Sequence, residues 1–192
     1  MAEILLFHHV QGLTQGVVHF ADKLRAAGHT VHTPDLFDGN VFATIDEGMA
    51  FAETLGFQTL MDRGLKVADG LPEALVYGGF SMGVMSAQQL AQTRPGAQGA
   101  LFYYSCLPFE EFGAKWPDSV PVQIHGMDGD PFFAGEGDID AARALVASGA
   151  PAELFVYSGD EHLFADDSLP AYDKAAADLL TERTLEFLAK IA

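Results

Sequence analysis

Residues 74–92 predict a strand, a sharp turn and a helix in direct succession. The apolar run that ends at Tyr77 is typical of a buried strand, and the segment from Val84 onward is typical of a helix. Between them lies Gly-Phe-Ser-Met-Gly at residues 79–83. In so tight a turn, a Cβ two residues before or after the serine would press strand against helix, so glycine suits both places. This G-x-S-x-G pattern indicates a nucleophile elbow, in which a strained backbone lifts the hydroxyl of Ser81 clear of the sheet. A glycine-rich turn with an incidental serine is the alternative interpretation.

Strand and helix patterns alternate along the rest of the chain, which predicts an α/β fold with a mostly parallel sheet and helices on both faces. Residues 35–72 carry spaced apolar residues that predict one or two helices over the sheet. The length of 192 residues suffices for one sizeable core, and no linker or repeat interrupts it, so we expect a single domain over residues 1–192. Apolar runs predict strands at 3–8, 30–33, 97–105, 121–125 and 152–157, and helical spacing predicts helices at 17–27, 138–148 and 172–191.

The charge balance excludes some classes of partner. Ten Lys and Arg stand against 27 Asp and Glu, for a formal net charge of −17. Such a surface repels phosphate backbones and anionic lipids, so we expect neither nucleic-acid nor membrane binding. No apolar stretch is long enough to span a bilayer, and the first residues lack the basic start of a signal peptide. With a single cysteine, Cys106, these features favour a reducing compartment and a cytoplasmic location.

A serine nucleophile needs a base and an acid that orients the base, and hydrolases supply them in the chain order Ser, Asp or Glu, His. Only two histidines follow Ser81. His162 lies in a loop after a predicted strand and can reach Ser81, so we expect it to be the general base. His125 ends a predicted strand and is more simply a structural residue. For the orienting acid we favour Asp130, which precedes a proline and the pair Phe132-Phe133 that could bury it beside the imidazole.

Other acidic residues are weaker candidates for that role. Asp128 and Asp138 are expected to be solvated or to cap secondary structure, while Asp160 and Glu161 are too near His162 in sequence. Two backbone N–H groups should bind the oxyanion, one from Met82 directly after the nucleophile. The other should come from the loop after the first strand, and Val10 is the best candidate there.

Residues 106–120 leave the C-terminal end of a strand, where ligands bind in open α/β sheets. Phe109 and Trp116 in this segment could wall a substrate pocket, and ordinary packing is the open alternative. Phe132 is a further candidate for substrate contact, because it sits beside the proposed acid.

These residues together resemble the dienelactone hydrolase family of α/β-hydrolases, and the likeness covers most of the chain. The motifs that carry it are LLFHHVQGLT from residue 5, YGGFSMG from residue 77, HGMDGDPFF from residue 125 and GDEHLFA from residue 159. The resemblance implies the α/β-hydrolase fold, places the family's catalytic aspartate on Asp130 and its histidine on His162, and implies no cofactor.

Three positions depart from the family pattern. Ser81 replaces the cysteine of the best-known members, and a serine depends more on its general base than a thiol does. His9 stands where those enzymes have a glutamate beside the nucleophile, which makes it a candidate for substrate contact. Asp166 stands where an arginine pairs with the dienelactone carboxylate. The resemblance therefore implies an ester or lactone hydrolase more strongly than an enzyme for a carboxylated dienelactone.

The leading hypothesis is hydrolysis of a small ester or lactone through an acyl-serine. A non-catalytic protein that binds a small molecule on a hydrolase scaffold is the main alternative, because a fold does not fix a function. A metal site built on His8, His9 and His125 is a third possibility. No H-x-H or H-x-x-x-H spacing supports it, so we predict none.

Overall fold

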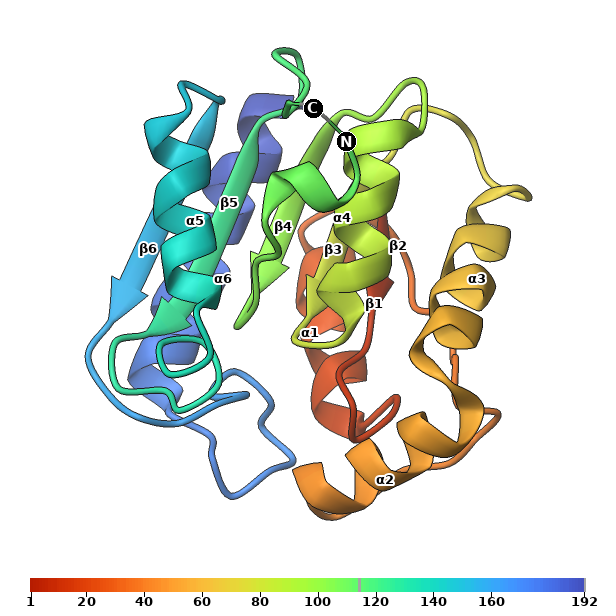
Figure 1. Ribbon diagram of the computed structural model, residues 1–192, viewed down its shortest axis with the longest axis vertical. Helices are drawn as coiled ribbons and strands as arrows, with labels where there is room; N and C mark the ends of the chain where they lie inside the picture. Colours follow the sequence, from red (N-terminus) through yellow and green to blue (C-terminus); the bar gives the residue numbers. More distant parts are fainter. Residues whose placement is uncertain (114, 192) are drawn as a thin grey trace.

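The computed structural model describes residues 1–113 and 115–191, and a six-stranded sheet runs through their centre (Figure 1). Its strand order is β2-β1-β3-β4-β5-β6, and every neighbouring pair is parallel. The predicted α/β fold is therefore confirmed, with a sheet that is parallel throughout. The strands are β1 (Glu3–Phe7), β2 (Thr30–His32), β3 (Val76–Phe80), β4 (Gly99–Tyr103), β5 (Val122–Met127) and β6 (Ala152–Tyr157).

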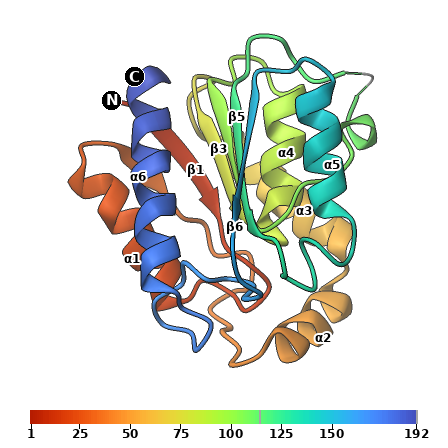
Figure 2. The ribbon, with the colours of Figure 1, turned by 90° about the vertical axis from the view of Figure 1, so that its left-hand side faces the viewer.

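Helices cover both faces of the sheet. Figure 2 shows α1 and α6 on one side and α3, α4 and α5 on the other, while α2 lies beyond the C-terminal ends of the strands. The helices are α1 (Gln15–Ala26), α2 (Ile45–Leu55), α3 (Phe57–Ala68), α4 (Gly83–Thr93), α5 (Asp138–Ala147) and α6 (Lys174–Ile191), and a 3-10 turn spans Phe109–Glu111.

Because helices cover both faces of the sheet, the strands have continuous apolar sequences. Alternate side chains of a strand point to opposite faces, so Ile4 and Leu6 of β1 enter the core under α1 and α6. Leu5 and Phe7 enter the core under the other helices, and all four side chains are completely buried. Among the described residues, no helix is long and apolar enough to cross a membrane.

Two strands extend beyond their predicted ends. The strand expected to end at His125 continues to Met127, because Gly126 and Met127 still pair with β6. His125 is thus an interior strand residue. The strand expected to end at Tyr77 runs on to Phe80, since both glycines at 78 and 79 pair with β4. Glycine is unfavourable in most strands, but a Cβ on Gly79 would press against the start of α4, and one on Gly78 would lie 2.8 Å from Leu6 of β1.

Candidate active site

Ser81 occupies the turn between β3 and α4, and its backbone is strained as the motif predicts. Its φ is 48°, in the left-handed region that costs a non-glycine residue about 1 kcal/mol or more. A Cβ on Gly79 would lie 2.4 Å from the backbone of Gly83, and one on Gly83 would lie 2.7 Å from the carbonyl oxygen of Phe7. The two glycines therefore allow α4 to begin directly against the sheet, with Ser81 at the crest of the turn.

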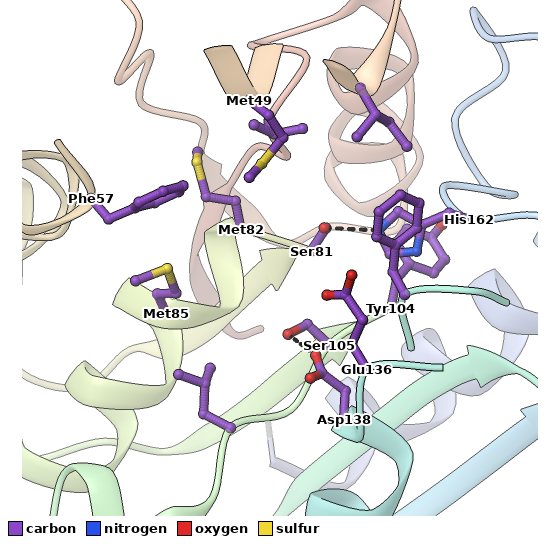
Figure 3. Close-up of a pocket in the computed structure, with 14 residues that line it drawn as sticks. Met49, Phe57, Ser81, Met82, Met85, Tyr104, Ser105, Glu136, Asp138 and His162 are labelled. Atoms are coloured by element: carbon purple, nitrogen blue, oxygen red, sulfur yellow. Dashed lines mark hydrogen bonds between the residues drawn. The ribbon is translucent and has the colours of Figure 1, made fainter. Parts of the chain in front are cut away.

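A chain of hydrogen bonds connects Ser81 with the two partners proposed for it. His162 Nε2 lies 2.8 Å from Ser81 Oγ (Figure 3). On the other side of the ring, His162 Nδ1 lies 2.6 Å from Asp130 Oδ2. Asp130 is completely buried, and its other oxygen accepts the N–H of Phe132 at 2.8 Å. Because a carboxylate only accepts, Nδ1 carries the proton and Nε2 is left to accept the hydroxyl of Ser81. This arrangement can remove the serine proton and hold it on the imidazole.

The loops after β5 and β6 bring Asp130 and His162 together by binding each other. The N–H of Gly129 donates to the carbonyl of Gly159 at 2.8 Å, and the N–H of Gly159 donates to Asp128 Oδ1 at 3.1 Å. Asp128, expected to be solvated or capping, therefore joins the two loops. The centroid of the Phe132 ring lies 4.7 Å from that of His162, and Phe132 lines the cavity described next.

A cavity of about 300 Å³ opens over Ser81. Its apolar wall comes largely from α2, α3 and α4, and Figure 3 shows Met49, Phe57 and Met85 around the serine. Val10 and Met82 also line it. Within the described part of the chain, neither of their N–H groups donates a hydrogen bond, and Met82 precedes the first residue of α4, at the positive end of the helix dipole. Two unpaired donors beside a nucleophile can stabilise an oxyanion.

The opposite side of the cavity is acidic. Glu136 and Asp138 both line it, and Asp138 Oδ2 accepts the hydroxyl of Ser105 at 2.5 Å and the N–H of Cys106 at 3.2 Å. Burial raises the pKa of Asp138, although these two hydrogen bonds oppose the rise. Sequence reasoning assigned Asp138 to solvent or to a cap and did not consider Glu136 for the site. Their position after β5, at the same edge of the sheet as Asp130, is the signal that could have identified them.

A model of the dienelactone hydrolase family matches residues 1–192. The chain belongs to this family. As a member it is a hydrolase, and its α/β-hydrolase fold is shared with structures of low sequence identity. One is a protein from Klebsiella pneumoniae assigned as a dienelactone hydrolase, with TM-score 0.75, 19% identity and coverage of 98% of this chain and 87% of that chain. Another is Thermogutta terrifontis esterase 2 phosphorylated by paraoxon, with TM-score 0.72, 16% identity and coverage of 100% and 83%.

One curated relative aligns over part of its length. The pimeloyl-[acyl-carrier protein] methyl ester esterase of Cronobacter sakazakii is 27% identical over 123 residues, which make up 64% of this chain and 44% of that protein. The chain thus matches less than half of this relative.

Three residues predicted to contact substrate lie outside the cavity. Trp116 is buried against Phe102, with ring centroids 5.9 Å apart, and its Nε1–H donates to the carbonyl of Val120 at 2.6 Å. Phe109 packs against the same side of the core. Tyr104, Ser105 and Leu107, directly after β4, line the cavity. The segment then folds back along the sheet, so the rings of Phe109 and Trp116 serve packing.

His9 is the third, and it is completely buried. Its Nε2 lies 2.9 Å from Asp166 Oδ2, and its Nδ1 accepts the N–H of Gln11 at 3.2 Å, so both ring nitrogens are occupied within the protein. His9 and Asp166, the two residues whose charge differs from the family pattern, thus bind each other.

The three histidines considered for a metal site are not assembled into one. His8 and His9 follow β1, whereas His125 lies in β5, beyond β3 and β4 in the sheet. His125 bonds instead to the hydroxyl of Tyr157, 2.9 Å from its Nδ1. Within residues 1–113 and 115–191, no three His, Cys, Asp or Glu side chains lie so that they could hold one metal ion together.

Proposed function

We propose that this protein hydrolyses a small carboxylic ester or lactone through an acyl-enzyme on Ser81. The observation that carries the proposal is the continuous hydrogen-bond chain from Ser81 through His162 to the buried Asp130, facing a cavity with two unpaired N–H donors. The expected partner is a small-molecule ester or lactone, and the chemistry needs no cofactor.

The proposed reaction has two halves. Ser81 Oγ attacks the ester carbonyl carbon while His162 Nε2 takes the hydroxyl proton, and the N–H groups of Val10 and Met82 bind the oxyanion that forms. The bond to the alcohol oxygen then breaks, and the imidazolium gives its proton to the leaving alcohol. In the second half, water attacks the acyl-serine and loses a proton to His162. Collapse of that intermediate releases the acid and returns the proton to Ser81.

The charge around the cavity supports a substrate class. Glu136 and Asp138 line it, and no lysine or arginine does so among the described residues. A carboxylate placed there would meet acidic groups without a cation, which is costly at close range. Asp166, at the position of the family's substrate-binding arginine, is buried with His9 outside the cavity. These features favour a neutral or cationic ester over a carboxylated lactone.

Hydrolysis of short p-nitrophenyl acyl esters tests the proposal. Purified protein should release p-nitrophenol and Ser81→Ala should abolish release, while Ser105→Ala is the matched control because Ser105 lines the same cavity yet donates to Asp138. A fluorophosphonate probe should label Ser81. Hydrolysis that survives in Ser81→Ala would contradict the proposal. Thermal stabilisation by a ligand that is never turned over, without probe labelling, would instead support a non-catalytic binding protein.

A further inference from the structure

The peptide unit between His9 and Val10 is held from its carbonyl side. The carbonyl oxygen of His9 accepts the Nδ1–H of His8 at 2.7 Å and the N–H of Gly12 at 3.0 Å. In a planar trans peptide the C=O and the following N–H point in opposite directions, so whatever fixes the first also fixes the second. The two bonds to the His9 carbonyl therefore set the direction of the Val10 N–H, which is unpaired beside the cavity among the described residues.

The ring of His8 is itself fixed by the fold. It is completely buried, lies edge-on to Phe37 with centroids 5.0 Å apart, and accepts the N–H of Leu36 at Nε2 over 3.0 Å. Because Nε2 accepts, the ring proton lies on Nδ1 and is available to the His9 carbonyl. Burial lowers the pKa of His8 to about 4, so this neutral tautomer persists at neutral pH.

The ring of His9 anchors the same turn to the loop that carries His162. Its Nε2–H donates to Asp166, whose carboxylate also accepts from the hydroxyls of Thr14 and Ser168. Burial alone would raise the pKa of Asp166, but the hydrogen bonds from His9, Ser168 and Thr14 outweigh it and hold the pKa below the usual value. An ionised acceptor strengthens each of these bonds. The turn after β1, the start of α1 and the histidine loop thus meet at one carboxylate.

We propose that His8 and His9 are positioning residues that aim the N–H of Val10 at the oxyanion, His8 through the His9 carbonyl and His9 through Asp166. This inference rests on the proposed function. A hydrogen bond to a peptide carbonyl also polarises the unit, so the His8 bond makes the Val10 N–H a better donor.

Two substitutions of His8 separate its two ring nitrogens. In His8→Asn the amide nitrogen takes the place of Nδ1 and can still donate to the His9 carbonyl, whereas in His8→Gln it takes the place of Nε2 and cannot. Loss of an oxyanion donor costs about 10²–10³ in kcat, and a misdirected donor costs less. We therefore expect His8→Gln to lower kcat about 10- to 100-fold with little change in KM, and His8→Asn to stay within about threefold of wild type.

The affinity of a transition-state analogue separates a role in binding the oxyanion from a role in stability alone. A trifluoromethyl ketone forms an oxyanion on the nucleophilic serine, so His8→Gln should weaken its binding by the same factor as it lowers kcat/KM. Asp166→Asn should do likewise, because its amide cannot satisfy all the donors around it. Asp167→Asn is the matched control, since Asp167 also pairs with a histidine, His19, at 2.9 Å, but on the surface.

The results that overturn the inference are distinct from those that overturn the proposed function. Wild-type kcat/KM and inhibitor affinity in both His8→Gln and Asp166→Asn would refute the positioning roles, as would equal losses in His8→Asn and His8→Gln. A wild-type protein that neither hydrolyses esters nor binds the ketone would refute the proposed function instead. The anchoring contact can be checked apart from activity, because Asp166→Asn should speed hydrogen exchange at the N–H of Gln11, which His9 Nδ1 protects.

Discussion

Acid should destabilise this protein through two buried histidines. Burial lowers the pKa of His8 to about 4 and that of His125 to about 3, against a usual value of 6.5 in an unfolded chain. Between pH 7 and pH 5 the unfolded chain therefore takes up protons that the folded protein refuses, and stability falls as pH falls. At about 1.4 kcal/mol per pH unit below 6.5, each histidine costs about 2 kcal/mol at pH 5. The two together should remove about 4 kcal/mol, a large part of the roughly 5–15 kcal/mol that is typical of a domain.

Urea unfolding at pH 7 and pH 5 measures this loss directly. In His125→Gln, which cannot titrate, the difference between the two pH values should shrink to about 2 kcal/mol, whatever the variant's absolute stability. His19→Asn, which removes a half-exposed histidine, is the control for loss of a histidine outside the core. Equal stability at pH 7 and pH 5, or an undiminished difference in His125→Gln, would refute the reasoning.

Three substitutions around the site have defined outcomes. Asp130→Asn should favour the wrong imidazole tautomer and lower kcat on p-nitrophenyl butyrate by about 10⁴, as in comparable triads; a loss below about tenfold would argue against the assigned role. Glu136→Gln should raise kcat/KM for a carboxylated p-nitrophenyl ester relative to its neutral counterpart about tenfold, and an unchanged ratio would remove this residue from substrate selection. Gly79→Ala should destabilise by about 3 kcal/mol in urea unfolding, because its Cβ meets the α4 backbone at 2.4 Å, whereas Gly70→Ala, with no contact closer than 3.9 Å, should be tolerated.

The order of strands and loops along the chain is enough to predict that Ser81, Asp130 and His162 lie close together. Parallel strands end at one edge of a sheet, so residues that follow β3, β5 and β6 must lie near one another. Chain order alone therefore places Ser81, Asp130 and His162 at one edge, and the fold brings them within hydrogen-bond distance. The strained turn is also predictable, because it depends on neighbouring residues alone. The two glycines that flank the serine are what a close approach of strand and helix requires.

The substrate side of the site was less predictable, because it depends on how loops fold back. Asp138 turns toward the cavity after Gly137, which adopts a left-handed φ of 102°, and hydrophobic periodicity carries no information on that turn. Trp116 comes after β4, which ends at the site, but its segment returns along the sheet and places the indole in the core, outside the cavity. The contact between His9 and Asp166 joins residues 157 positions apart, and no local pattern indicates it.

Mass spectrometry of the protein after reaction with paraoxon tests the central claim most directly. Paraoxon phosphorylates activated serine hydroxyls, and here the hydroxyl of Ser81 lies 2.8 Å from the imidazole of His162. Our account predicts one diethylphosphoryl group per chain, on the peptide that contains Ser81, with slow modification in His162→Ala and none in Ser81→Ala. Modification at another residue, or equally fast modification without His162, would contradict it.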